Sequence, residues 1–221
     1  MENLKVIKWT KKSLNSNKGL LIFLVLMVIF RSAIADWNTV PTASMNPTIV
    51  EGDRILVNKL AYDLRVPFSG QSIVKLADPI RGDIIIFNSK VAEIRLVKRV
   101  IGVAGDSVKM INNELYINDQ KLTYQNAELN KLNVQVQETL FGNKYNIQHN
   151  INGSEVDSFA EVIVPENQYL VLGDNRDNSA DSRFIGFVSR DEIIGRTNSV
   201  VLSLNYANYY IPRLNRFFKK L

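Results

Sequence analysis

Glu93-Ile94-Arg95-Leu96-Val97-Lys98-Arg99-Val100-Ile101 is the stretch that says most about the fold of this chain. It is rich in Ile, Val and Leu, a composition typical of a β-strand. Because side chains alternate between the two faces of a strand, Lys98 shares a face with Leu96 and Val100. Burial disfavours the charged form of a lysine, so a lysine on an apolar face is a candidate base near neutral pH. The alternative is a lysine at a strand end whose ammonium group reaches solvent.

Short runs of the same kind recur from Val40 onward, separated by Gly, Asn, Asp and Pro, and they indicate a mostly-β body. We expect strands at 54–59, 83–87, 93–103, 107–111, 114–117, 132–139, 161–164, 168–172 and 192–204. Asn112-Asn113 and Asn118-Asp119 predict tight turns, since Asn and Asp tolerate the backbone that such turns need. The more polar segment 121–158 is expected to be a β insertion with long loops.

Composition limits the chemistry open to the chain. Of 221 residues, 46% are apolar, enough for a substantial core, and none is cysteine, which excludes disulfides, thiol nucleophiles and Cys-based zinc sites. The single histidine, His149, lies in a polar stretch. A Ser-His-Asp triad is therefore not expected, and we predict no metal and no cofactor. A serine nucleophile would need another base, and lysine is the substitute we expect.

The net charge of +5 is concentrated at the two ends of the chain. Residues 1–18 and 213–221 each carry +4, which leaves −3 for the 194 residues between them. A slightly acidic body lacks the basic face that nucleic-acid binding requires, so we do not expect a nucleic-acid partner.

Residues 19–35 form an apolar run of 17 residues, interrupted by Arg31 near its end. As a helix the run spans about 26 Å, slightly less than a hydrocarbon core of roughly 30 Å. Arg31 would snorkel to the headgroups, and Trp37 lies where an interfacial anchor belongs. Lysines before the run predict a cytoplasmic N-terminus, with the rest of the chain on the outer side.

The competing interpretation of this run is a cleaved signal peptide. A basic region, an apolar stretch and the small-x-small triplet Ala33-Ile34-Ala35 fit that pattern too. Arg31, between the apolar stretch and the triplet, argues against efficient cleavage. N-terminal sequencing of the mature protein separates the two interpretations.

Ser44 lies in Val40-Pro41-Thr42-Ala43-Ser44-Met45-Asn46-Pro47-Thr48-Ile49. Prolines on both sides restrict the backbone, so a fixed, exposed turn is predicted. A hydroxyl on such a turn suits a nucleophile, and the Ser44 N–H with the Thr42 hydroxyl would form an oxyanion site. The alternative is a Ser/Thr-rich loop that hydrogen-bonds only its own backbone.

A third polar segment is Gly173-Asp174-Asn175-Arg176-Asp177-Asn178-Ser179-Ala180-Asp181-Ser182-Arg183. A calcium loop starting at Asp177 would need a glycine and a glutamate where the sequence has Ser182 and Val188, so calcium binding is excluded. Asp-Arg pairs are expected to fix this loop and to present Ser179 to a neighbour.

Together these segments resemble the bacterial type I signal peptidase family, membrane-anchored serine proteases that remove signal peptides from exported proteins. The resemblance is carried, in the family's order and spacing, by four blocks: 41–48, Arg81-Gly82-Asp83-Ile84-Ile85-Ile86-Phe87, 98–106 and 173–183. The matched blocks span about residues 37–204. One departure is Ala43, at a position that is usually glycine in the family.

The resemblance implies that Ser44 attacks the scissile carbonyl, while Lys98, neutral in the free enzyme, takes its proton and later delivers one to the leaving amine. It also places Thr42 and the Ser44 N–H at the oxyanion. Ser179 would orient the Lys98 ammonium group by hydrogen bonding.

The remaining implied roles concern support and substrate binding. Asp181 and Arg183 would form a supporting pair. Family substrates bind extended, with small residues at the first and third positions before the cut. Candidates for lining the two pockets are Val40, Ile49 and Val97.

The implied fold is a mostly antiparallel β catalytic core with a smaller β insertion, preceded by one N-terminal transmembrane helix. The expected parts are a cytoplasmic basic segment (1–18), an anchor (19–36), the β catalytic core (37–120 and 159–212), the insertion (121–158) and a basic-aromatic tail (213–221). We expect the bacterial cytoplasmic membrane as location, crossed once, with the catalytic domain outside. The expected partners are signal peptides of exported preproteins and the lipid bilayer.

Two other classes of protein stay open. A self-cleaving Ser-Lys regulator would share the dyad, although a membrane span and an acidic body do not suit a DNA-binding switch. A non-catalytic membrane-tethered β adaptor would keep the blocks without activity. For the segment 213–221, a second surface contact with the membrane and a solvated tail are both open.

Overall fold

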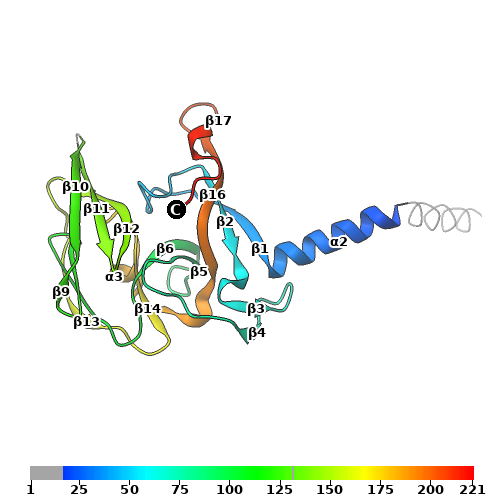
Figure 1. Ribbon diagram of the computed structural model, residues 1–221, viewed down its shortest axis with the longest axis horizontal. Coiled ribbons are helices and arrows are strands. Elements are labelled where there is room, and N and C mark those ends of the chain that lie inside the picture. The colour runs from blue at the N-terminus through cyan, green and yellow to red at the C-terminus, as the bar shows by residue number, and fades with distance from the viewer. Residues whose placement is uncertain (1–16, 131) are drawn as a thin grey trace, which may run out of the picture.

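The computed structural model describes residues 17–130 and 132–221 and shows a helix leading into a mostly-β body (Figure 1). The mostly-β prediction is confirmed. Residues 1–16 of the expected basic cytoplasmic segment 1–18 lie outside the described residues. Among the described residues, the other helical pieces are short: α3 (Ser182–Ile185), η1 (Lys59–Ala61), η2 (Arg190–Glu192) and η3 (Leu214–Arg216).

The larger part of the body is an eight-stranded antiparallel sheet in the order β1-β2-β16-β5-β6-β14-β15, with β17 paired to β16. Its strands are β1 (Ala35–Thr39), β2 (Asp53–Asn58), β5 (Ile84–Asn88), β6 (Arg95–Gly102), β14 (Gln168–Leu172), β15 (Val188–Ser189), β16 (Ile193–Asn205) and β17 (Ile211–Pro212). A separate hairpin pairs β3 (Asp63–Arg65) with β4 (Ser72–Lys75).

Strand β5 shows why this sheet is buried on both faces. Its four consecutive apolar residues, Ile84 to Phe87, are all buried, and alternation sends them to opposite sides. Ile84 and Ile86 join an apolar cluster with Met45, while Ile85 and Phe87 join another cluster. Each such side chain contributes roughly 1.5–3 kcal/mol by leaving water. The sheet is thereby fixed as the rigid centre of the body.

Two smaller sheets form the second lobe, on the left of Figure 1. A four-stranded sheet joins β13 (Phe159–Ile163), β7 (Ser107–Ile111), β8 (Glu114–Ile117) and β9 (Gln120–Lys121), and a three-stranded sheet joins β10 (Thr123–Leu129), β11 (Asn133–Leu140) and β12 (Asn143–Asn150). They share one apolar cluster with the ends of β6 and β14. The expected insertion boundary at residue 121 falls within β9, between strands that share one apolar cluster. The structure therefore does not separate residues 121–158 as a unit, and the insertion remains a prediction.

The nine expected strands coincide with strands of the structure to within a few residues. The two expected tight turns are confirmed, because Asn112, Asn113, Asn118 and Asp119 all have φ between 51° and 63°. The strands that went unpredicted include β10 and β12, whose sequences are mostly polar. Pairing across β11 holds them in the sheet despite their composition.

The apolar run at 19–35 forms helix α2 (Lys18–Ala33), whose side chains are exposed. Within the described part of the chain, no helix combines the length and apolarity needed to cross a membrane. Ala35 and Asp36, the last two residues of the expected anchor 19–36, belong to β1 and pair with β2. Lys59 donates hydrogen bonds to two carbonyl groups in the last turn of α2, which satisfies that end of the helix.

The C-terminal segment is docked on the body. The Arg216 guanidinium donates two hydrogen bonds to the buried carboxylate of Asp53, at 3.0 and 2.6 Å, and one to the Thr48 carbonyl. Val200 donates to the Lys219 carbonyl. The segment 213–221 is therefore held against the body by these bonds, while Leu214, Asn215, Phe218, Lys219 and Lys220 stay exposed.

Candidate active site

Ser44 lies in a loop, residues 40–52, that connects β1 to β2 and closes on itself. Val40 donates to the Asp53 carbonyl and Gly52 donates to the Val40 carbonyl, so the ends of the loop meet at the edge of the sheet. Met45 and Ile49 are buried and anchor the loop in an apolar cluster. Ala43 does not adopt a positive φ, so replacement of the family's usual glycine causes no strain here.

Lys98 reaches this loop from β6, and its Nζ lies 2.8 Å from the Ser44 Oγ. The register sets Lys98 opposite Ile85, whose apolar cluster also holds Leu96 and Val100, which confirms the predicted face. Lys98 is only 2% exposed. Burial lowers its pKa to about 8, against the opposing effect of the Asp181 and Asp174 charges. A substantial fraction of this lysine is therefore neutral near physiological pH.

The loop that follows β14 clamps the nucleophile loop through Asn175. The Asn175 N–H donates to the Ser44 carbonyl at 3.1 Å, and its side-chain amide donates to the Ala43 carbonyl at 3.0 Å. Gly173 makes the approach possible, because a Cβ there would stand 2.4 Å from the Ser44 carbonyl oxygen. Sequence reasoning did not single out Asn175, since nothing in the sequence pairs a loop amide with a carbonyl 132 residues earlier.

Two Asp-Arg pairs hold this loop, as predicted. Arg183 forms two hydrogen bonds with Asp181, at 2.8 and 2.7 Å, and Asp181 also accepts the Gly173 N–H. Arg99 forms two bonds with Asp174, at 2.8 and 2.7 Å, and all four of these side chains are almost fully buried. Such bidentate pairs fix both position and orientation.

The predicted oxyanion groups lie beside Ser44. The Thr42 hydroxyl is 3.5 Å from the Ser44 Oγ, and within the described residues the Ser44 N–H makes no hydrogen bond. Ser179 behaves differently from the expectation: its Oγ is buried beside Gly173 but has no hydrogen-bond partner among the described residues, Lys98 included. Its hydroxyl therefore lies near the site and makes no hydrogen bond with the described residues.

The three pocket candidates belong to one apolar cluster. Val40 and Ile49 are buried, Val97 is partly buried, and all three belong to the apolar cluster of Met45. The described residues contain no group of three His, Asp or Glu side chains arranged to hold a metal ion.

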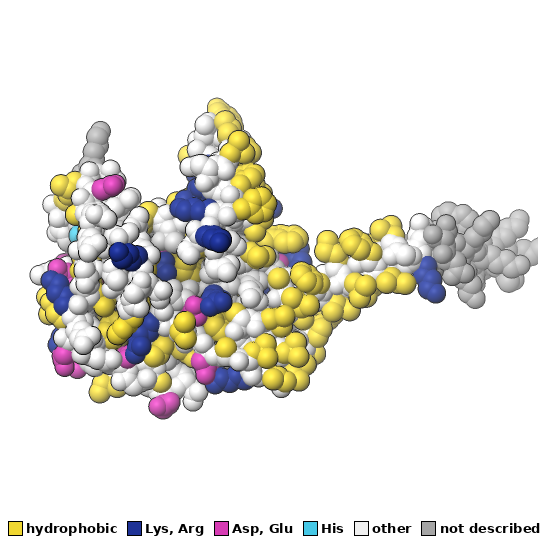
Figure 2. Space-filling model, viewed as in Figure 1, with side chains coloured by type: hydrophobic (Ala, Val, Ile, Leu, Met, Phe, Trp, Pro, Cys, Tyr) yellow, Lys and Arg dark blue, Asp and Glu magenta, His cyan; other side chains and the backbone are white. Residues whose placement is uncertain are grey.

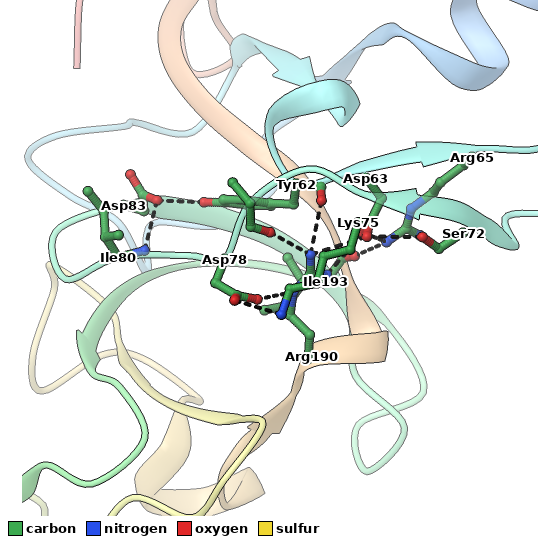
Figure 3. A network of polar contacts seen from close by, with 11 residues as sticks. Tyr62, Asp63, Arg65, Ser72, Lys75, Asp78, Ile80, Asp83, Arg190 and Ile193 are labelled. Carbon is green, nitrogen blue, oxygen red and sulfur yellow. Dashed lines mark hydrogen bonds and ion pairs between the residues drawn. The ribbon is translucent and has the colours of Figure 1, made fainter.

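A cavity of about 620 Å³ lies elsewhere, between the β3–β4 hairpin and the chain around Arg190. Figure 3 shows the polar side chains near it, where Arg190 contacts both Asp63 and Asp78. These groups are paired with one another, and the Ser44–Lys98 contact does not line this cavity.

A serine hydroxyl against a buried lysine, held on a β scaffold, is an arrangement that a serine hydrolase without a catalytic histidine can use. The profile of the family described as signal peptidase, peptidase S26, matches residues 13–202. The chain belongs to this family. It is a serine endopeptidase of the signal peptidase I type, which removes signal peptides.

Individual proteins similar to this chain are signal peptidases as well. The signal peptidase I of Buchnera aphidicola (Schizaphis graminum) is 31% identical over 90% of this chain and 78% of its own length. That of Aquifex aeolicus is 34% identical over 80% and 79%, and signal peptidase I P of Bacillus subtilis subsp. natto is 33% identical over 86% and 89%. A crystal structure of a signal peptidase I from Enterococcus faecalis, at 31% identity, covers 55% of this chain and 98% of its own, with a TM-score of 0.37.

Proposed function

We propose that this enzyme cleaves signal peptides with a Ser44–Lys98 dyad at the surface of the bacterial cytoplasmic membrane. The observation that carries the proposal is the 2.8 Å contact between Ser44 Oγ and Lys98 Nζ, made by a lysine that burial keeps partly neutral. In its neutral form Lys98 accepts the Ser44 proton, which is the requirement for a general base.

The reaction then follows two steps. Ser44 Oγ attacks the scissile carbonyl carbon while its proton passes to Lys98 Nζ, and the resulting ammonium group returns a proton to the leaving amine as the peptide bond breaks. Water next attacks the acyl-enzyme ester and gives a proton to Lys98 Nζ, which passes it to Ser44 Oγ as the ester bond breaks. Ser44 is thereby restored, and the signal peptide leaves as a carboxylate whose remaining proton goes to solvent. No histidine takes part.

The free Ser44 N–H and the Thr42 hydroxyl are the groups we assign to the oxyanion. A donor placed where the negative charge develops is worth about 10²–10³ in rate. We assign Ser179 to the Lys98 ammonium group, since its buried hydroxyl has no other partner among the described residues. The bidentate Asp181–Arg183 pair supports that loop.

The exposed edge of β6 offers a place for an extended substrate. β14 pairs with β6 only from Arg99 to Gly102, so the segment Arg95–Lys98 is left without a strand on that side within the described chain. An extended peptide adds to such an edge by main-chain hydrogen bonds. Its small side chains would then face the apolar cluster of Val40, Ile49 and Val97.

A lipid bilayer is the surface we propose for this enzyme. Figure 2 shows apolar side chains along α2, at the β3–β4 end and on the arm that carries β17. The exposed apolar residues include Phe68, Ile73 and Leu76 near the hairpin, and Tyr209, Ile211 and Phe218 near the arm. Patches of this kind on soluble surfaces mark interaction sites. With α2 in the bilayer and the N-terminus in the cytoplasm, the chain would cross the membrane once. The catalytic body would then lie on the outer side.

The test is cleavage of an exported precursor with a small-x-small site, in vesicles, by the wild type and by Ser44→Ala and Lys98→Ala. We expect both variants to lose activity and to remain folded, each with a single cooperative unfolding transition. Lys90→Ala is the matched control, because Lys90 is an exposed lysine paired with Asp191. Full activity in Lys98→Ala would refute the dyad. Vesicle flotation of the full chain tests the membrane part separately.

A further inference from the structure

The three-stranded sheet of the second lobe carries a buried glutamate that no motif includes. Glu138, in β11, is 0% exposed and lies opposite Tyr145 of β12. We propose that Glu138 is a positioning residue for catalysis, which holds the loop 174–176 in register with Lys98 and the nucleophile loop. The inference rests on the proposed Ser44–Lys98 dyad and extends it to a strand that lies outside the four matched blocks in sequence.

Three donors converge on the Glu138 carboxylate. The Tyr124 hydroxyl donates to Oε2 at 2.8 Å, the Tyr145 hydroxyl donates to Oε1 at 2.5 Å, and the Arg176 Nη2 donates to Oε1 at 2.6 Å. Burial opposes the charge of Arg176, but Glu138 raises the pKa of this guanidinium above its ordinary value. Arg176 therefore keeps its charge, and hydrogen bonds from an ionised donor are the stronger ones.

Among the described residues, Glu138 is the one carboxylate that pairs with Arg176. Arg176 is 0% exposed, and neither its Nε nor its Nη1 has a hydrogen-bond partner among the described residues. A buried cation that loses its one carboxylate is strongly destabilised. The ion pair with Glu138 therefore fixes the position of the Arg176 side chain.

From Glu138, two short routes lead to the dyad. On the first, Arg176 follows Asn175, whose side chain and N–H bind the nucleophile loop, and the Arg176 N–H donates to the Gln148 carbonyl. On the second, the Tyr145 ring lies 3.8 Å from the Arg99 guanidinium, next to Lys98 in sequence. Arg99 also binds Asp174. Glu138 is therefore linked to both ends of the loop 174–176, to Arg176 directly and to Asp174 through Tyr145 and Arg99.

This arrangement differs from an ion pair that only stabilises the core. Buried ion pairs are often replaceable by apolar side chains without loss of stability. Apolar contact lacks the direction of a hydrogen bond, and a displacement of about 1 Å in an active site can cost about 10²-fold in rate. Stability and kcat should therefore separate when the pair is replaced.

The experiment compares the wild type with Glu138→Met/Arg176→Met and Tyr145→Phe, with Tyr116→Phe as control on β8. We expect the double variant to unfold at or above the wild-type temperature, with kcat about 10- to 100-fold lower and KM within about twofold. Tyr145→Phe removes one donor and keeps the ring under Arg99; its kcat should fall about tenfold or somewhat less. Tyr116→Phe should match the wild type.

A folded double variant with wild-type kcat overturns the inference. If the double variant does not fold, Tyr145→Phe decides, and wild-type kcat in that variant overturns it equally. Lys98→Met, measured in the same assay, keeps the two proposals apart. An active Lys98→Met variant would refute the dyad. An inactive Lys98→Met variant together with a fully active double variant would refute only the role of Glu138.

Discussion

Lys98 and Arg99 are neighbours in β6, both buried and both cationic, yet their environments differ. Arg99 faces Asp174 and forms two hydrogen bonds with it. Burial would lower the pKa of Arg99, but the Asp174 charge and hydrogen bonds raise it instead. Lys98 faces the Ser44 hydroxyl, and burial lowers its pKa to about 8.

The difference teaches how one strand supports both structure and chemistry. A buried cation with a carboxylate partner keeps its proton and fixes its surroundings. A buried cation with only a hydroxyl partner gives up its proton easily and becomes a base. Alternation along β6 sends the two side chains to opposite faces, so the two roles coexist in adjacent residues.

The largest effect is expected when Lys98 is given the chemistry of Arg99. Lys98→Arg keeps the positive charge, but a guanidinium does not lose its proton in proteins, so the base is absent. We expect kcat to fall by about 10²–10⁴ at every pH. Single-turnover cleavage of a precursor measures this, and recovery of activity at high pH would contradict it.

The reverse change removes the structural cation. Arg99→Met leaves the Asp174 carboxylate buried without its partner, which is expected to cost about 3–5 kcal/mol of unfolding free energy. Urea unfolding measures the loss. Arg99→Met/Asp174→Leu is the control, and it should regain most of the stability because no charge remains unpaired. A single variant as stable as the wild type would show that the pair contributes nothing.

Lys98→Met is expected to stabilise the fold. The unfolded chain binds more protons than the folded one between the folded pKa of about 8 and the ordinary 10.5. Stability is therefore lost as pH falls through this window, and the full cost is present below it. The gain on substitution is roughly 3 kcal/mol at pH 7 and vanishes above the ordinary lysine pKa. Unfolding of both proteins at pH 7 and at pH 11 tests the sign, and a loss of stability at pH 7 would refute it.

A smaller effect is expected at Asn175, whose side chain orients the nucleophile loop without contacting the side chains of Ser44 and Lys98. Asn175→Ala removes the side-chain bond to the Ala43 carbonyl and keeps the backbone bond to Ser44. We expect kcat to fall about tenfold, the value of one such bond. Asn178→Ala in the same loop is the matched control, because that side chain is exposed. Equal activities in the two variants would remove the role of Asn175.

Much of the site was predictable because its main residues lie on a regular pattern. Alternation placed Lys98 on an apolar face, and the same reasoning applied to β11 would have found Glu138, which shares a face with Val136 and Leu140. Asn175 had no such signal, since its partners come from a distant loop. Strand β1 had no signal either, because its pairing with β2 does not show in the sequence, and the expected boundary between the anchor and the core falls inside it, at residue 37.

The most direct test of the account is the pH dependence of kcat/KM for precursor cleavage by the wild type. Lys98 has to be neutral to accept the Ser44 proton, so the account predicts that kcat/KM rises with pH and levels off above a pKa of about 8. A profile that is flat between pH 6 and pH 9, or one that keeps rising towards the ordinary lysine pKa, would contradict it.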